Sequence, residues 1–500
     1  MKTLNLRIIS RITGLLLVFL SALFLTISYR SFQPGTCVFP HGSEIGGVNV
    51  SGLDPEQAKI LLMSKYENPI IIKQNEFEIE LTIEQLGVSI NYDNMDENLS
   101  CDQGKSLKKF LNYLWGTVTT EPIMQNLDYS LQEEMIHTTV DHLIAPYFEK
   151  PSSSPYAIKG TTRYFPGENG ISIDKEKLVE DIKNQLLSIN KEPILLDLIE
   201  IPAPPPEIVI IKDQIKEIIQ ASQFNGVVEL FAQQLTQDEQ LQLLMWYGEE
   251  KQPGVAFTAA STMKIPILIS TFWRNDIPLN DNLNEWIVSM IVNSENDPAD
   301  RLMEQIDPIR GPLMVTSDMQ TFGFENTFIA GYFYLGAPLL DLYQTPANQR
   351  NDAFVNPDIY NQTTPEEIGE LLILLSRCAE DYYAEMVQKS QGLISSPECQ
   401  QMIDVLSRNK MGALIEAGLP EGTRIAHKHG WSQERDGLVH SFSDVAIVYG
   451  PESDFVVTIF LYSQDQLLFD QANPLIARIS QSVFNAYNLN HQISWPFPEE

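Results

Sequence analysis

The chain begins with an apolar segment, Ile12 to Tyr29, that contains no charged residue. A segment of this length is just sufficient to cross a bilayer as a helix. Lys2, Arg7 and Arg11 precede it, so we expect residues 1–11 to lie in the cytoplasm and the chain after residue 29 to lie outside a single-pass membrane anchor. A cleavable signal peptide is the alternative, although no A-x-A site follows the apolar segment.

The region 38–200 mixes strand and helix patterns and predicts a small α+β domain. From Phe77 to Glu84 apolar and polar residues alternate, which is typical of a half-buried strand. Helical patterns cover Leu107–Leu114, Ser130–Ile144 and Ile173–Leu187, the last with Asp174 as a possible N-cap. The proline-rich segment 201–206 then predicts a stiff, extended linker to a second domain.

The region 207–490 has a different order of elements. A helix over Ile208–Ala221 and a strand over Val227–Phe231 are followed by a mostly helical middle that runs to about Leu406. Two β-branched, apolar strands and a final helix close the region, at Asp444–Tyr449, Phe455–Tyr462 and Pro474–Asn488. Helices at both ends of a terminal antiparallel sheet predict an α+β sandwich.

Composition narrows the class of protein. The 500 residues are too many for a single core, and 43% hydrophobic and 20% charged residues are typical of a globular chain. The net charge is -33, from 66 acidic and 33 basic residues. Nucleic-acid binding needs a concentrated basic face, so this charge argues against a nucleic-acid partner.

The cysteines and histidines indicate disulfides and no metal site. Four cysteines suit an extracytoplasmic chain, and the local pairing joins Cys37 with Cys101 and Cys378 with Cys399. Free buried thiols are the alternative. No C-x-x-C or H-E-x-x-H motif occurs, so we expect no metal and no cofactor.

One serine stands out as a candidate nucleophile. Ser261 has Lys264 three residues later, and although four other serines share that spacing, only Ser261 precedes an apolar run that predicts a buried helix. At the first turn of such a helix the hydroxyl lies near unpaired backbone N–H groups, with the lysine one turn away on the same face. Lys264 can act as a base only if burial and a nearby cation lower its pKa.

Two further motifs follow in order. Ser294 and Asn296 form an S-x-N motif after an amphipathic helix at Trp286–Val292, and Lys428-His429-Gly430 forms a K-x-G motif at the start of a strand pattern. The second lysine supplies the cation that Lys264 requires. The order S-x-x-K, S-x-N, K-x-G within one domain is typical of serine acyl-enzymes.

On these motifs, residues 207–490 resemble the class A β-lactamase and penicillin-binding superfamily, with "AASTMK", "IVNSENDPADRLM" and "GLPEGTRIAHKHGW" as the matching segments. The resemblance implies a five-stranded antiparallel sheet flanked by helices, plus an all-helical subdomain. It also implies a role for each motif residue. Ser261 would be the nucleophile, Lys264 its base, and Ser294 a proton shuttle to the leaving nitrogen. Asn296 would hold the lysine and the substrate amide, Lys428 would supply positive potential for the substrate carboxylate, and His429 and Gly430 would bind the substrate. The backbone N–H groups of Ser261 and Trp431 would form the oxyanion hole.

Three departures from the family pattern affect the expected chemistry. His429 replaces the usual hydroxyl, and only 33 residues separate Ser261 from Ser294, which indicates a more open cleft. Between Glu325 and Glu366 there is no glutamate to activate water. We therefore expect acylation by a β-lactam or a D-Ala-type peptidoglycan peptide, followed by slow deacylation. A D,D-peptidase or esterase, and a non-catalytic cell-wall binding or sensing protein, are the alternatives.

The N-terminal region resembles the peptidoglycan-binding domain of YoaR- and VanW-type cell-wall proteins. The matching segments are "GGVNVSGLDPEQAKILL", "FEIELTIEQLGVSINYD" and "YFPGENGISIDKEKLVEDI", within residues 38–200. The resemblance implies contact with peptidoglycan. A spacer that lifts the second domain away from the membrane is the alternative.

Overall fold

The structure is a computed structural model that describes residues 2–31, 37–95, 99, 107–115, 121–434 and 436–494. It divides into two compact units. Unit 1 contains Met1–Pro151 and Asn169–Ile201, and unit 2 contains Ser152–Glu168 and Pro202–Glu500. The predicted linker therefore begins at the boundary between the units. Residues 152–168, which we had assigned to the N-terminal domain, group with unit 2 instead.

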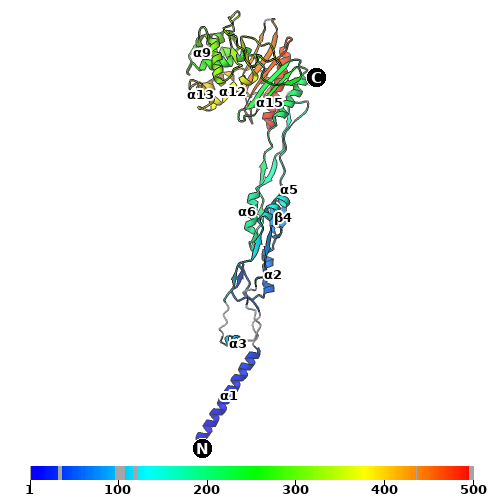
Figure 1. Ribbon diagram of the computed structural model, residues 1–500, viewed down its shortest axis with the longest axis vertical. Coiled ribbons are helices and arrows are strands. Elements are labelled where there is room, and N and C mark those ends of the chain that lie inside the picture. Colours follow the sequence, from blue (N-terminus) through cyan, green and yellow to red (C-terminus); the bar gives the residue numbers. More distant parts are fainter. Residues whose placement is uncertain are drawn as a thin grey trace. The chain divides into compact units, whose positions relative to one another are not determined.

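Unit 1 begins with the helix α1 (Lys2–Ser31), visible at the blue end of the chain in Figure 1. Its segment Ser10–Ser31 is long and apolar enough to cross a membrane, and none of that segment is buried in the protein. By length and composition it fits a membrane span, and an N-terminal signal sequence fits the same criteria.

The remaining unit 1 elements form short sheets and helices. Its strands are β1 (Glu44–Ile45), β2 (Val48–Asn49), β3 (Ile70–Gln74), β4 (Phe77–Leu81), β5 (Val88–Ile90), β6 (Met124–Gln125), β7 (Tyr129–Leu131), β10 (Gly170–Ile173), β11 (Ile194–Leu195) and β12 (Leu198–Ile201). Its other helices are α2 (Pro55–Tyr66), α3 (Leu107–Leu114), α4 (Glu133–Thr139), the π-helical η1 (Val140–Ile144), α5 (Ala145–Phe148) and α6 (Lys175–Leu186).

Two predictions in unit 1 can be compared with these bounds. The Asp174 side chain accepts a hydrogen bond from the Lys177 backbone N–H at 2.9 Å, which confirms it as the N-cap of α6. The helix predicted over Ser130–Ile144 was wrong at its start. Tyr129–Leu131 pairs with β5 as an antiparallel strand, and the helix begins at Glu133.

Unit 2 contains one large antiparallel sheet with strand order β15-β14-β13-β21-β20-β19. Its strands are β13 (Val227–Gln234), β14 (Gln240–Trp246), β15 (Glu249–Lys251), β19 (Arg424–Gln433), β20 (Val439–Tyr449) and β21 (Phe455–Tyr462). Within the described part of unit 2 the sheet thus has six strands, not the five expected. The short edge strand β15 accounts for the difference, because it turns back from β14 and pairs over Leu244–Trp246.

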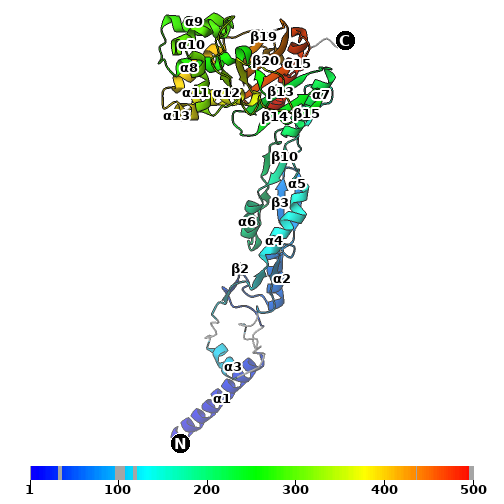
Figure 2. The same cartoon turned by 45° about the horizontal axis from the view of Figure 1, so that its top comes forward.

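Helices cover both faces of this sheet (Figure 2). The period of two in β13 explains why: Val227 and Phe231 pack with the helical subdomain, whereas Val228 and Leu230 pack beneath α7 and α15. The helices that contribute to these two cores are α7 (Ile208–Ala221), α8 (Lys264–Phe272), α9 (Asp281–Val292), α10 (Asn296–Ile306), α11 (Gly311–Phe322), α12 (Pro365–Glu380), α13 (Glu385–Lys389), α14 (Ser396–Leu406) and α15 (Phe469–Tyr487).

Smaller elements complete unit 2. They are the hairpin β8 (Tyr156–Ala157) and β9 (Tyr164–Phe165), the sheet of β16 (Phe257–Thr258), β18 (Asn361–Thr363) and β17 (Phe328–Ile329), and the 3-10 helices η2 (Ala260–Met263), η3 (Glu416–Gly418) and η4 (Leu489–His491).

A disulfide and a hairpin tie parts of unit 2 together. Cys378 on α12 and Cys399 on α14 form a disulfide that spans 21 positions and is fully buried. Cys37 is disulfide-bonded as well, whereas Cys101, its predicted partner, lies outside the described residues. The β8–β9 hairpin docks on α15 through Tyr164, whose hydroxyl lies 2.9 Å from the Ser482 hydroxyl.

Candidate active site

The local backbone sets the position of Ser261. It lies in η2, directly before α8, and the preceding residue Ala260 has a φ of +48°. Strand β19 runs close beside this turn. A Cβ at Gly430 would lie 2.8 Å from the Ala259 carbonyl oxygen and 3.1 Å from the Thr262 amide nitrogen, so only glycine permits the approach. We predicted Ser261 in the first turn of the buried helix, but it lies in a 3-10 turn directly before that helix.

Lys264 is the first residue of α8 and is completely buried. Its Nζ lies 3.1 Å from Ser261 Oγ, 2.9 Å from Asn296 Oδ1 and 2.5 Å from the Ser294 carbonyl oxygen. These partners come from separate elements, because Ser294 lies between α9 and α10 and Asn296 begins α10. The structure therefore brings the S-x-x-K and S-x-N motifs into one hydrogen-bonded cluster.

Lys428 enters the same cluster from β19. Its Nζ lies 2.9 Å from Ser294 Oγ and 3.1 Å from the His429 carbonyl oxygen, and the side chain is completely buried. Ser294 itself has a φ of +60°, an uncommon conformation for a residue other than glycine. In this conformation its hydroxyl lies between the two lysines, 3.5 Å from Lys264 Nζ. The K-x-G motif occupies the middle of β19 rather than its start.

Burial lowers the pKa of both lysines to about 7. For Lys264 the loss of solvent outweighs the carboxylates of Asp300 and Glu295, which act in the opposite direction. For Lys428 burial comes first, and the positive charge of Lys264 lowers its pKa further. Neither side chain is therefore held as a permanent cation near neutral pH.

His429 and Trp431 continue along β19 beyond Lys428. The two rings stack, with centroids 4.8 Å apart and planes inclined by 23°. Burial, followed by the charge of Lys428, lowers the pKa of His429 to about 3, so the imidazole is neutral. All eight sequence-predicted residues of the site thus lie on η2, α8, the α9–α10 turn, the start of α10 and β19.

Two residues near the lysines were missed by the sequence analysis. The carboxylate of Asp300 on α10 accepts a hydrogen bond from the Phe333 backbone N–H at 2.7 Å, and burial raises its pKa to about 6. This contact holds the Phe333 ring with its centroid 5.5 Å from Lys264 Nζ. In the sequence, Asp300 follows Asn296 by four residues, which places both on one face of a helix, and this spacing could have indicated that Asp300 lies near the site.

The residues behind β19 form a second buried cluster. His427 lies on the opposite side of the strand from Lys428, and its Nδ1 is 3.1 Å from Asp444 Oδ1. Its Nε2 donates to the Asn409 carbonyl oxygen at 2.9 Å. Both ring nitrogens face acceptors, an arrangement that suits an imidazolium. Burial lowers the pKa of His427, but the Asp444 carboxylate and the hydrogen bonds outweigh burial and raise that pKa above its usual value.

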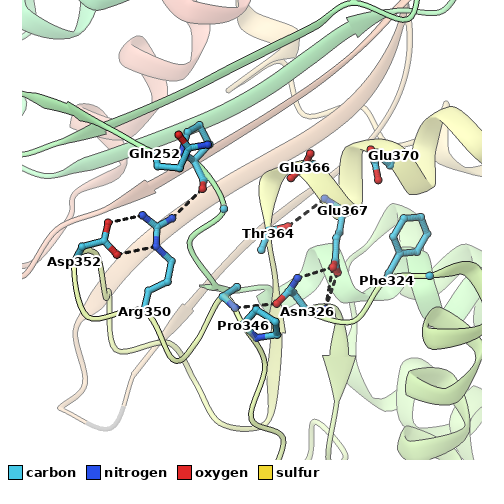
Figure 3. Close-up of a pocket in the computed structure, with 14 residues that line it drawn as sticks. Gln252, Phe324, Asn326, Pro346, Arg350, Asp352, Thr364, Glu366, Glu367 and Glu370 are labelled. Atoms are coloured by element: carbon cyan, nitrogen blue, oxygen red, sulfur yellow. Dashed lines mark hydrogen bonds and ion pairs between the residues drawn. The ribbon is translucent and has the colours of Figure 1, made fainter.

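A cavity of about 670 Å³ opens elsewhere in unit 2 and contains none of the predicted site residues. Figure 3 shows that its polar side chains bind one another: Arg350 pairs with Asp352 at 2.6 Å, and the Glu367 carboxylate accepts from the Asn326 backbone and side chain. The nucleophile, base and cation of the candidate site lie outside this cavity.

Comparison with known proteins finds similarity to β-lactamases. The model of the β-lactamase enzyme family matches residues 278–487. A β-lactamase of Bacillus licheniformis is 34% identical over 98 residues, which are 19% of this chain. The chain spans 30% of the length of that curated relative.

Solved structures match the C-terminal part as well. PBP-A, determined as an acyl-enzyme complex with penicillin G, is 20% identical and covers 57% of this chain and 98% of its own, with a TM-score of 0.40. A class A β-lactamase from Bacteroides cellulosilyticus is 16% identical over 56% of this chain and 99% of its own, also with a TM-score of 0.40. The family and sequence matches support a serine hydrolase of the β-lactamase type in the C-terminal part of the chain.

Proposed function

We propose that unit 2 is a serine hydrolase that forms an acyl-enzyme through Ser261 with a β-lactam or a D-Ala-type peptidoglycan peptide. The observation that supports this most directly is the 3.1 Å contact between Lys264 Nζ and Ser261 Oγ, at a lysine whose pKa is about 7. A buried amine that is about half neutral near pH 7 can accept the serine proton.

Acylation follows from the order of contacts. The Ser261 oxygen attacks the substrate carbonyl while its proton passes to Lys264, and the new C–O bond is followed by cleavage of the C–N bond. The leaving nitrogen receives a proton from the Ser294 hydroxyl. Lys428, 2.9 Å from that hydroxyl, replaces the proton. Asn296 holds the Lys264 amine through its side-chain oxygen at 2.9 Å.

Negative charge develops on the substrate carbonyl oxygen during acylation, and it requires hydrogen-bond donors that are already in position. We assign this role to the backbone N–H groups of Ser261 and Trp431. The close approach of β19 to η2 at Gly430 supports the assignment, because it brings the two backbones together at the nucleophile. Lys428 and the neutral His429 ring then form the site for an anionic group of the substrate, with Gly430 leaving room beside them.

Deacylation is expected to be slow. Among the described residues, Lys264 has no carboxylate as a hydrogen-bond partner: its partners are Ser261, Ser294 and Asn296. The Phe333 ring lies 5.5 Å from its Nζ, and the Asp300 carboxylate beside that ring accepts from the Phe333 backbone N–H. An acyl-enzyme without a base for water persists. This feature favours the behaviour of a penicillin-binding protein over that of an efficient β-lactamase.

The proposal extends to location. With α1 as an uncleaved anchor, unit 2 acts outside the cell membrane, where peptidoglycan is available. The basic residues before Ile12 support this orientation. Peptidoglycan binding by residues 38–200 remains a prediction from their resemblance to YoaR- and VanW-type proteins.

Covalent labelling tests the enzyme proposal. The full chain is incubated with a fluorescent penicillin, and intact mass is followed over hours together with hydrolysis of nitrocefin. Wild type should gain one adduct that decays slowly, and Ser261→Ala should gain none. Ser188→Ala is the matched control, because Ser188 also has a lysine three residues later but lies in unit 1. Rapid nitrocefin turnover would contradict slow deacylation, and no labelling of wild type would contradict acylation altogether.

A further inference from the structure

The histidine in the K-x-G motif raises a question that the family resemblance does not answer. A hydroxyl in this place can rotate to donate or accept. A neutral imidazole has one N–H and one acceptor nitrogen, so its tautomer decides which atom can serve the substrate. The residues around His429 show which tautomer is present.

Asn409 is held in one orientation behind the strand. It is buried, with 2% of its surface exposed, in the loop that follows α14. Its Nδ2 lies 3.1 Å from the His427 carbonyl oxygen. Because a carbonyl oxygen only accepts, the amide nitrogen must face it, and this contact fixes the orientation of the side-chain amide. The backbone of Asn409 is fixed as well, since its carbonyl accepts from the His427 ring.

The same nitrogen reaches His429. Asn409 Nδ2 lies 3.4 Å from His429 Nδ1. An amide nitrogen only donates, so Nδ1 must be the acceptor and the ring proton must reside on Nε2. Stacking on Trp431 restricts rotation of the ring. In the described part of the chain Nε2 has no hydrogen-bond partner, and the neighbouring Lys428 ammonium favours a neutral ring.

We propose that Asn409 is a positioning residue that holds His429 in the tautomer with the proton on Nε2, so that this neutral N–H receives a carboxylate oxygen of the substrate. The proposal deepens the proposed function and rests on it, because it names the atom that recognises the anionic group. Asn409 does not touch the substrate. It acts through His429.

Nitrogen NMR of the full chain, labelled with 15N-histidine, tests the tautomer directly. The seven histidines give separate signals, and His429→Thr identifies the signal that disappears. We expect His429 to carry its proton on Nε2 in wild type. A proton on Nδ1 in wild type would overturn the proposal, whatever the kinetics show.

Kinetics test the consequence. Asn409→Leu removes the donor at similar volume, and we expect the acylation rate constant for benzylpenicillin to fall about tenfold, as for the loss of one hydrogen bond to a charged group. The methyl ester of benzylpenicillin, which lacks the carboxylate, should be unaffected. In a His429→Thr background, where a hydroxyl serves the carboxylate, Asn409→Leu should cause no further loss.

The outcomes separate the two proposals. An equal loss in the His429→Thr background, or with the methyl ester, would assign Asn409 a general structural role and overturn the inference. Absence of acylation in wild type would instead refute the proposed function, while the NMR spectrum would still decide the tautomer. If Asn409→Leu does not fold, as judged by circular dichroism, Asn409→Asp replaces it: the acceptor should move the His429 proton to Nδ1.

Discussion

Lys428 Nζ lies 2.9 Å from the Ser294 hydroxyl, although the two residues are 134 positions apart in the chain. Lys264 Nζ lies 3.5 Å from the same hydroxyl. One small side chain therefore separates two buried amines and allows a proton to pass between them. This arrangement explains why Ser294 adopts a left-handed backbone conformation, because the turn between α9 and α10 must direct its hydroxyl at both lysines.

Loss of the Ser294 hydroxyl should slow acylation more than it weakens substrate binding. For Ser294→Ala we expect the rate constant of acylation by benzylpenicillin to fall about 100-fold, the lower range for removal of a positioned proton donor. Stopped-flow labelling measures the effect. Ser317→Ala on α11, an exposed serine outside the cluster, should match wild type. A drop in both variants would indicate a general effect on folding.

The dependence of acylation on pH should be bell-shaped, with a maximum near pH 7. The rate rises as Lys264 loses its proton, because its neutral amine is the base, and it falls as Lys428 loses the charge that attracts the substrate carboxylate. The two amines interact, so the apparent pKa values belong to the pair. Rate profiles from pH 5 to pH 9 measure the two limbs.

A matched variant separates the two limbs. Lys428→Arg keeps a positive charge at every accessible pH, since a guanidinium does not lose its proton in this range. The falling limb should disappear, and the rate should rise to a plateau that lies below the wild-type maximum, because a guanidinium cannot return a proton to Ser294. Persistence of the falling limb in Lys428→Arg would assign it to another group.

The buried pair of His427 and Asp444 should make unit 2 less stable at alkaline pH. The folded-state pKa of His427 is raised above 6.5, so its contribution to stability is complete below pH 6.5 and is lost as pH rises through the folded value. Asp444→Asn leaves a buried, unpaired cation and should lower the free energy of unfolding by about 3 kcal/mol below pH 6.5. Urea unfolding at several pH values measures both effects. An unchanged pH slope in Asp444→Asn would contradict the pairing.

The β8–β9 hairpin should contribute to the stability of unit 2. Tyr164 is 1% exposed, and its backbone N–H donates to Gln492. Tyr164→Ala should lower the free energy of unfolding by about 3 kcal/mol, as for other large-to-small changes at buried aromatic residues. Tyr156→Ala on the same hairpin is the control, because Tyr156 is 56% exposed. We expect the control to lose less than about 1 kcal/mol. Similar losses in the two variants would indicate that the hairpin is not docked.

The disulfide between Cys378 and Cys399 should stabilise the helical subdomain. Its loop of 21 positions predicts a contribution of about 3 kcal/mol to the free energy of unfolding. The double variant Cys378→Ala/Cys399→Ala should show this loss in oxidising buffer, and reduction of wild type should reproduce it. Equal stability of oxidised wild type and the double variant would show that the crosslink is energetically neutral.

The sequence allowed the residues of the site to be predicted where each motif has a local signal. Ser261 was distinguished from four other serines by the apolar run of α8, and the order of the three motifs placed Lys428 near it. The two last strands were also predicted, because their β-branched residues are buried on both faces; β21 has the predicted bounds, whereas β20 begins at Val439 and not at Asp444. These features depend on neighbours in the sequence.

The remaining features depend on tertiary contacts. Asn409 and Asp300 act through partners on other elements, and a single asparagine or aspartate gives no periodic signal. The left-handed conformations of Ala260 and Ser294 follow from the packing around the site and not from residue type, since glycine would be the expected choice. The edge strand β15 contains only three residues, too few for an alternating pattern.

Residues 152–168 belong to unit 2, whereas the residues before and after them belong to unit 1, and this order affects proteolysis. The chain passes between the two units at residues 151–152, 168–169 and 201–202. A protease that cuts only the proline-rich segment produces an N-terminal fragment that still contains the β8–β9 hairpin. The hairpin stays bound to α15 through Thr162, Tyr164 and their partners. A single nick therefore does not release the Ser261 domain from its N-terminal half, and shedding requires unfolding of the hairpin or a second cut.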